Sequence, residues 1–280
     1  MTDTGEAAEN GPGLWEPLRR HTPARVGLGR TGHALPLRHL LEFQAAHALA
    51  RDAVHRAVDF DALRTGLTGH PVAGVRSAAP DRAAYLRRPD LGRRLHPDDG
   101  PRLAGLPGGG TLVVIADGLS ATAVQLHALP LLEALVPLLG EDTGEGTGSG
   151  TGAGEGTRAG REAVPVVLAS QARVALGDEI GERVGARLVL VLIGERPGLS
   201  AADSLGVYLT YGPRSGRRDA ERNCVSNIHP PAGLGYRAAA RTVASLVAGA
   251  KRLGLSGVAL SGEEPAGPGA LPAGDLPGPG

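Results

Sequence analysis

The chain has 280 residues, of which 41% are hydrophobic, and its 29 basic residues balance 29 acidic ones. A chain of this length can bury a full hydrophobic core, so one or two domains are expected. The net charge of zero gives no electrostatic reason to expect a nucleic acid or an anionic membrane as partner. A single cysteine excludes an internal disulfide and a cysteine-based zinc site, which is typical of proteins in the cytoplasm.

Targeting and membrane segments are not predicted. The acidic, glycine-rich residues 1–13 lack the basic start and the apolar run of a secretion signal. No apolar stretch approaches the roughly 20 residues that a membrane-spanning helix needs. Residues 1–13, the Gly/Thr/Glu-rich insert 140–161 and the Pro/Gly-rich tail 262–280 are predicted to be disordered. Such segments bury too little apolar surface to offset the entropy lost on ordering.

Residues 14–110 are predicted to form a helical N-terminal part. Leucine and alanine side chains recur near the 3.6-residue period of a helix over Pro36–Val58. From Arg64 to Gly110 the pattern is loose, and six prolines interrupt it. This second stretch therefore predicts no regular element.

The pattern changes at Thr111. Thr111–Ala116 is a short, continuous apolar run, which is typical of a strand buried on both faces. Asp117 and Gly118 turn the chain, Ser120 can cap a helix, and Leu119–Leu139 has a helical pattern.

After the insert, strands and helices are predicted to alternate. The expected strands are Val164–Leu168, Arg187–Ile193, Leu205–Tyr211 and Gly257–Leu260. The expected helices are Asp178–Gly185 and Tyr236–Leu253. Alternating strands and helices favour βαβ units, so residues 111–261 are predicted to form a Rossmann-like α/β domain. Its sheet is expected to be mostly parallel, with flanking helices, and to follow the helical N-terminal part.

The segment Gly27–Gly32 matches the G-x-G-x-x-G spacing of dinucleotide-binding loops. Such a site needs a strand before the motif, a helix directly after it and an acidic residue about 20 positions later. Here only the short run Ala24–Val26 precedes the motif, Pro36 delays the helix, and Asp52 falls inside the helical pattern. These departures favour a plain glycine-rich turn over a nucleotide site.

Polar residues follow two of the predicted strands. At Asp117–Ser120 the backbone N–H groups can face a ligand, although a simple turn with a capping serine is favoured. Glu195 and Arg196 follow the strand Arg187–Ile193 in a loop rich in glycine and proline. Ligands of open α/β sheets lie outside the carboxyl ends of the strands, and a carboxylate there can accept hydrogen bonds. A ligand role and a surface ion pair both remain open for Glu195.

A second polar turn is predicted over Glu221–His229, and it contains the only cysteine, Cys224. Cys224 and His229 alone do not make a metal site, and the sequence shows no base that would activate the thiol. The favoured interpretation is a small buried residue in a tight turn. Because no Ser/His/Asp order, His-rich cluster or phosphate-binding loop occurs either, no catalytic or metal-ligating residue is predicted.

Seven stretches together give the chain a family resemblance. They are Ala24–Gly32, Tyr85–Leu95, Val114–Ser120, Arg173–Gly185, Val191–Leu199, Ser204–Tyr211 and Asp219–His229. On these stretches the sequence resembles the small subunit of ethanolamine ammonia-lyase, an adenosylcobalamin-dependent enzyme. The motifs YLRRPDLGRRL, IGERPGL and RNCVSNIH are the most specific of the set.

The resemblance implies a two-subunit lyase that converts ethanolamine to acetaldehyde and ammonia by a radical mechanism. It implies that the substrate site lies mainly on a large subunit and that the small subunit covers cobalamin where the two chains meet. The family's cobalamin contacts fall on Val174, Glu195 and Cys224 of this chain. A carboxylate can accept hydrogen bonds from the amide side chains that rim a corrin ring, whereas Val174 and Cys224 offer backbone groups and small apolar surface.

Two further readings stay open beside this one. The chain is alternatively a non-catalytic Rossmann-like nucleotide-binding protein or a structural adaptor. The expected location is the cytoplasm, with residence in a bacterial microcompartment left open.

Overall fold

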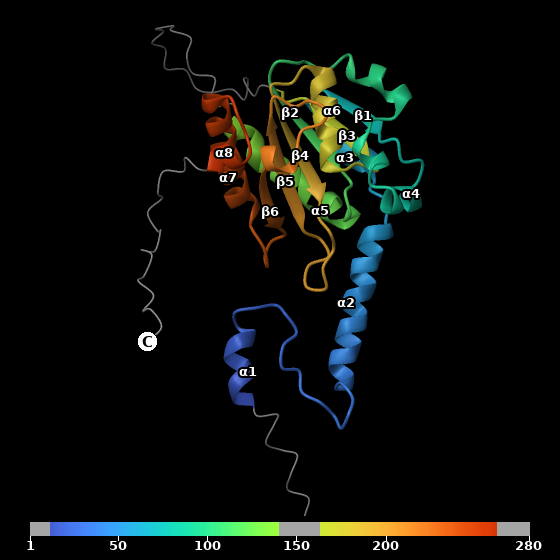
Figure 1. Ribbon diagram of the computed structural model, residues 1–280, viewed down its shortest axis with the longest axis vertical. Coiled ribbons are helices and arrows are strands. Elements are labelled where there is room, and N and C mark those ends of the chain that lie inside the picture. The colour runs from blue at the N-terminus through green and yellow to red at the C-terminus, as the bar shows by residue number, and fades with distance from the viewer. Residues whose placement is uncertain (1–11, 140–162, 262–280) are drawn as a thin grey trace, which may run out of the picture.

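The computed structural model describes residues 12–139 and 163–261 (Figure 1). The segments predicted to be disordered lie outside these residues, except that Pro12 and Gly13 begin helix α1 (Pro12–Arg19).

A six-stranded sheet forms the centre of the molecule, with the strand order β1-β3-β2-β4-β5-β6. Its first four strands in that order are parallel neighbours: β1 (Val72–Arg76), β3 (Val166–Ser170), β2 (Thr111–Ala116) and β4 (Leu188–Gly194). The other two strands, β5 (Leu205–Tyr211) and β6 (Asn223–Ile228), extend the sheet in the antiparallel sense. The predicted α/β class and the mostly parallel sheet are confirmed.

Helices cover both faces of the sheet, so two separate hydrophobic clusters form. On one face lie α3 (Phe60–Gly66), α5 (Ala121–Leu139) and α7 (Tyr236–Leu253). The other face is covered by α6 (Val174–Val184) and by the 3-10 helix Pro97–Leu103. Two short helical pieces, α4 (Arg82–Arg87) and the 3-10 helix Leu91–Arg93, lead the chain back towards the start of α6. A further 3-10 helix, Asp219–Glu221, precedes β6.

Helix α5 is the one described helix that is long and apolar enough to cross a membrane by length and composition alone. It has 19 residues and a mean hydropathy of 1.5, so the expectation that no apolar stretch approaches this length is wrong. Ten of its residues are buried, and they pack against the sheet and α7. Its apolar surface therefore belongs to the core of the fold.

Three elements differ from the sequence prediction. The sheet does not begin at Thr111, because β1 comes from the stretch that predicted no element; this edge strand has only two valines among its five residues. Strand β6 replaces the predicted polar turn at the opposite edge of the sheet, and its buried and exposed residues alternate over Asn223–Ser226. The predicted strand Gly257–Leu260 is instead the short helix α8 (Val258–Ser261), which packs on α7 and β6.

The N-terminal helices extend away from the sheet (Figure 1). Helix α2 (Leu37–His55) projects from the body, and a loop joins its far end to α1. Among the 19 residues of α2, only Ala53 is buried.

Candidate functional site

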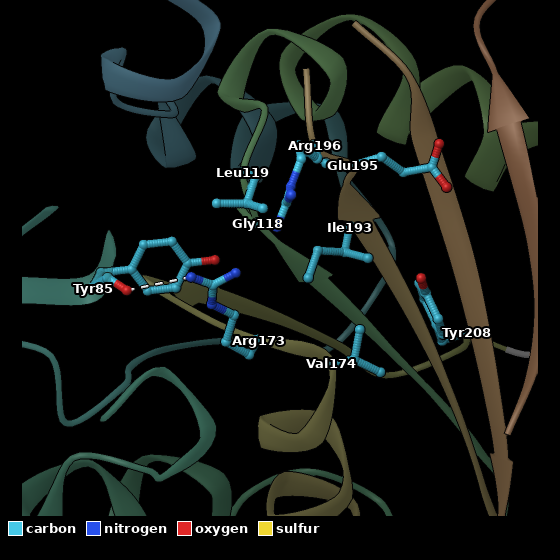
Figure 2. A pocket seen from close by; sticks show the side chains of 10 residues that line it. Tyr85, Gly118, Leu119, Arg173, Val174, Ile193, Glu195, Arg196 and Tyr208 are labelled. Atoms are coloured by element: carbon cyan, nitrogen blue, oxygen red, sulfur yellow. Dashed lines mark hydrogen bonds between the residues drawn. The ribbon is translucent and has the colours of Figure 1, made fainter. Parts of the chain in front are cut away.

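A pocket of about 440 Å³ lies at the carboxyl ends of the parallel strands (Figure 2). Its walls come from the residues that follow β2, β3 and β4, together with α4 and β5. The chain leaves β2 for α5 on one face of the sheet and leaves β3 for α6 on the other face. Strand ends whose connections diverge in this way open a crevice, which is the usual ligand position in open α/β sheets.

Asp117, which precedes the pocket residue Gly118, holds the segments after β2 and β3 together. Its side chain is only 6% exposed, and its two oxygens accept the backbone N–H groups of Gln171 and Ala172, each at 2.9 Å. Arg82 pairs with the same carboxylate at 3.4 Å. Burial raises the pKa of the Asp117 carboxyl, and these hydrogen bonds oppose the rise. Asp117 therefore joins the ends of β2 and β3 to each other.

Two glycines allow the β2–α5 turn to lie directly on the end of β4. Gly118 has φ of +56°, and a Cβ there would stand 2.2 Å from the Gly194 carbonyl oxygen. A Cβ on Gly194 would stand 2.1 Å from the Ser120 carbonyl oxygen. The predicted cap is confirmed, since the Ser120 hydroxyl accepts the Ala123 N–H at 3.1 Å. Gly118 and Leu119 of this turn also line the pocket. The capped turn that the sequence favoured therefore also faces the pocket.

Tyr85 lies on one side of the pocket beside Arg173 (Figure 2). Arg82 and Arg173 lie over its ring at 4.7 and 4.3 Å from the ring centre, and such stacking favours the cations. Burial raises the pKa of the Tyr85 hydroxyl, which donates to the Ala172 carbonyl at 3.0 Å. Arg173 Nε is buried and has no hydrogen-bond partner, so this wall retains an unused donor.

Glu195 forms the opposite side, and its carboxylate is held in place (Figure 2). Its Oε2 atom accepts the Ser204 hydroxyl at 2.5 Å and the Asn227 N–H at 3.2 Å. Oε1 accepts no hydrogen bond from the described residues of the chain. No ion pair joins Glu195 to Arg196 there, and their side chains point in different directions. The surface ion pair that the sequence left open is therefore not formed.

The structure brings two of the three predicted contact residues into the pocket. Val174 is the first residue of α6 and lines the pocket with Glu195. Cys224 is not in the lining; it lies on β6 directly opposite Tyr208, which is in the lining. Val174 and Glu195 thus share the pocket, whereas Cys224 lies one strand beyond it, paired with the middle of β5.

The prediction that Cys224 is a buried residue in a tight turn is wrong. Cys224 is exposed, because it occupies an outward position of the edge strand β6. Partial desolvation nevertheless raises the pKa of its thiol, and the nearby Glu195 charge adds to this. The thiol is therefore protonated at neutral pH, which is consistent with the expectation that it is not a nucleophile.

The glycine-rich motif Gly27–Gly32 is a plain turn, as the departures from the dinucleotide pattern predicted. Its three glycines all have positive φ angles, and neither a strand before it nor a helix directly after it is formed. The described residues also contain no group of three or more His, Cys, Asp or Glu side chains placed to hold a metal ion.

Sequence reasoning missed three residues of the pocket wall: Tyr85, Arg173 and Tyr208. All three lie in stretches that carry the family resemblance. Of the three, only Arg173 could have been suspected from the local sequence, because it follows a predicted strand, where ligands commonly bind. Tyr85 reaches the pocket through the fold of residues 82–103, where no element was predicted.

The fold defines an α/β protein with a pocket at the carboxyl ends of its parallel strands. The chain belongs to the ethanolamine ammonia-lyase light chain (EutC) family, whose model matches residues 12–261. It is 49% identical over 270 residues to the ethanolamine ammonia-lyase small subunit of Azotobacter vinelandii, covering 94% of this chain and 92% of the relative. The small subunit of Rhodopseudomonas palustris is 52% identical over 247 residues, covering 87% and 88%.

Proposed function

We propose that this chain is the small subunit of an ethanolamine ammonia-lyase that binds adenosylcobalamin together with a large subunit and converts ethanolamine to acetaldehyde and ammonia. The family membership supports the subunit role. The observation that carries the cofactor part is the Glu195 carboxylate, which is anchored through one oxygen and leaves the other without a partner at the rim of the pocket.

The residues present fit one edge of a corrin ring. Amide side chains rim such a ring, so an acceptor such as Glu195 Oε1 and a donor such as the guanidinium of Arg173, which lines the pocket, match its hydrogen-bonding groups. Leu119, Val174 and Ile193 supply apolar wall between them. A volume of about 440 Å³ is at the lower end for ligand pockets, which span roughly 300–1,000 Å³. This site therefore covers part of the cofactor, and a second chain is needed to enclose the rest.

The cofactor, when bound, supplies the radical through homolysis of its cobalt–carbon bond. The tasks of this chain are to bind and to exclude water. Glu195 positions one edge of the ring by accepting a hydrogen bond, and Val174 covers the neighbouring edge with apolar surface. For Cys224, which is exposed on β6 one strand beyond the pocket lining, we propose a contact with the cofactor through its backbone and its small size.

We also propose that the α/β fold is Rossmann-like. This assignment is supported by the β2-α5-β3-α6-β4 succession, whose two helices pack on opposite faces and whose crevice holds the pocket. We also propose a cytoplasmic location, on the strength of the single cysteine, with residence in a microcompartment as an open alternative.

The test is titration of the reconstituted two-subunit enzyme with adenosylcobalamin, followed by its visible absorption. Loss of one partner of a buried hydrogen bond typically costs about 1–3 kcal/mol, so Glu195→Ala is expected to weaken cofactor binding roughly 5- to 150-fold. Cys224→Ser keeps the size and the backbone and is expected to bind nearly as wild type. Circular dichroism checks that both variants fold.

Three outcomes would count against the proposal. Wild-type complex that takes up no cobalamin would refute the cofactor assignment. Glu195→Ala that binds as tightly as wild type would remove the carboxylate from the site. Acetaldehyde production by the small subunit alone, with adenosylcobalamin and ethanolamine, would show that the reaction centre lies on this chain.

A further inference from the structure

The N-terminal arm, residues 12–56, carries most of the large apolar side chains that are exposed in the described part of the chain. Eight of the eleven large apolar side chains that are exposed among the described residues lie on it. Leu37 is 68% exposed, Leu41 54%, Phe43 42% and Leu49 64%. Scattered single apolar residues are normal on a surface, but a cluster of this size marks an interaction site.

Helix α2 is apolar on more than one side. Successive residues of an α-helix are about 100° apart around its axis, so Leu41 and Phe43 point to nearly opposite sides. Both are exposed. A helix that is apolar on opposite sides needs to be surrounded by protein, so a partner that packs along a single stripe would leave one of these side chains in water.

The size of the helix leads to the same conclusion. A helix of 19 residues is about 28 Å long and about 10 Å wide, which gives its sides roughly 900 Å² of surface. A stable protein interface covers about 800 Å² on each partner. Contact along one side of α2 falls short of this area, whereas enclosure in a groove reaches it.

The charge of the arm indicates the chemistry of that groove. Residues 12–56 contain seven arginines and only three carboxylates, although the chain as a whole is neutral. Opposite charge at the rim of an interface favours encounter and fixes orientation. A groove that fits the arm is therefore apolar inside and carries carboxylates along its edge.

The arm is also joined to the segment that follows Glu195. The guanidinium of Arg25 donates to the Leu199 carbonyl at 3.4 and 3.5 Å, and the Ser200 hydroxyl donates to the Pro23 carbonyl at 3.4 Å. A protein that encloses the arm consequently lies on the same side of the molecule as the pocket, where a second chain is needed to enclose the cofactor.

We propose that the arm is the docking element for the large subunit, which encloses α2 in an apolar groove edged by carboxylates. This inference rests on the proposed function for the identity of the partner. It does not require cobalamin to be present.

The test uses the full-length chain and the purified large subunit without cofactor. The triple variant Leu37→Ser, Leu41→Ser, Phe43→Ser is compared with wild type by calorimetric titration. These side chains are exposed, so their replacement leaves the fold of the free chain intact. A matched control replaces Leu126, which is 52% exposed, and Val258, which is 72% exposed, on the body of the molecule. The arm variant is expected to bind the large subunit at least about 100-fold more weakly, and the control to bind as wild type.

Binding of wild type is also expected to weaken as salt is raised from about 50 to 500 mM, because the arm carries excess positive charge. Equal binding by the arm variant and wild type would overturn the proposal. A second contrary result is that the arm variant no longer self-associates in sedimentation but binds the large subunit as wild type does. The arm would then be the contact with a second copy of this chain. Binding of wild type, and not the variant, to anionic lipid vesicles with no effect on the large subunit would assign it to a membrane surface. A complex that assembles through the arm but takes up no cobalamin would refute the proposed function and leave the docking intact.

Discussion

Gly206 of β5 lies beneath the Glu195 carboxylate, and this contact permits a sharp test of the site. A Cβ at position 206 would stand 2.8 Å from Glu195 Oε1 and 3.3 Å from its Cδ and Cγ atoms, whereas ordinary contacts are 3.4–4 Å. Gly206→Ala therefore displaces the carboxylate from Ser204 and Asn227 without removing its charge. The clash is with the end of a flexible side chain, so rotation of Glu195 relieves it.

The expected effect separates affinity from stability. Gly206 has no positive φ, so alanine adopts its backbone conformation, and the lower entropy of the unfolded chain contributes about 0.4–1 kcal/mol in favour of folding. The free energy of unfolding should therefore change by less than about 1 kcal/mol. Misplacing a buried hydrogen-bonding group costs about 1–3 kcal/mol, which corresponds to roughly 5- to 150-fold weaker binding of adenosylcobalamin to the two-subunit complex.

A double-mutant cycle measures whether the two positions act as one unit. Glu195→Ala and Glu195→Ala/Gly206→Ala are expected to bind the cofactor equally, because no carboxylate remains to be displaced. Gly198→Ala is the matched control, since its Cβ would meet only the Ala201 carbonyl, at an ordinary 3.6 Å. Additive losses in the double variant, or wild-type affinity of Gly206→Ala, would refute this account of how Glu195 is placed.

Two predictions concern stability. Asp117→Asn turns one carboxylate oxygen into a donor facing the Gln171 or Ala172 N–H, so we expect a loss of about 1–3 kcal/mol, seen as a lower melting temperature; an unchanged temperature would contradict the anchoring role. Hydrogen bonds from Arg76 hold the pKa of Asp99 below its ordinary value, so its contribution to stability is present above about pH 4 and is lost as the pH falls further. Asp99→Asn should therefore lower the free energy of unfolding at pH 7 by about 1–3 kcal/mol and much less at pH 3 in urea titrations, and a pH-independent difference would be inconsistent with this.

The strands that are buried on both faces were predictable from the sequence. Thr111–Ala116 matches β2 at both ends, and Leu205–Tyr211 matches β5, because a continuous apolar run leaves no other environment for its side chains. Helix Tyr236–Leu253 was equally clear, since its apolar residues follow one stripe.

The two edge strands were not predictable in the same way. An edge strand has one neighbour and is partly in water, so its sequence need not be apolar. β6 alternates buried and exposed residues over Asn223–Ser226, and its exposed residues are Cys224, Ser226 and Asn227. The error in β6 led directly to the error about Cys224, because the exposure of its side chain follows from its place on that strand.

The pocket was predictable only in part. A strand end that carries Glu195 is a local pattern, and the position of Val174 followed from the family resemblance. The partner of each residue was not visible: Glu195 is anchored by Asn227, which lies on a different strand, and Arg173 stacks on Tyr85, which is 88 positions away in the sequence. Such pairs are produced by the strand order, which local patterns do not encode.

The burial of α5 under α7 has a consequence for the synthesis of the chain. About 110 residues separate the end of α5 at Leu139 from the end of α7 at Leu253. At a ribosomal rate of about 5–20 residues per second, α7 is completed roughly 5–20 s after α5. During that interval the nascent chain presents an apolar helix long enough to attract chaperones, or other nascent chains, and its yield in the cell is expected to depend on how quickly the C-terminal third is made.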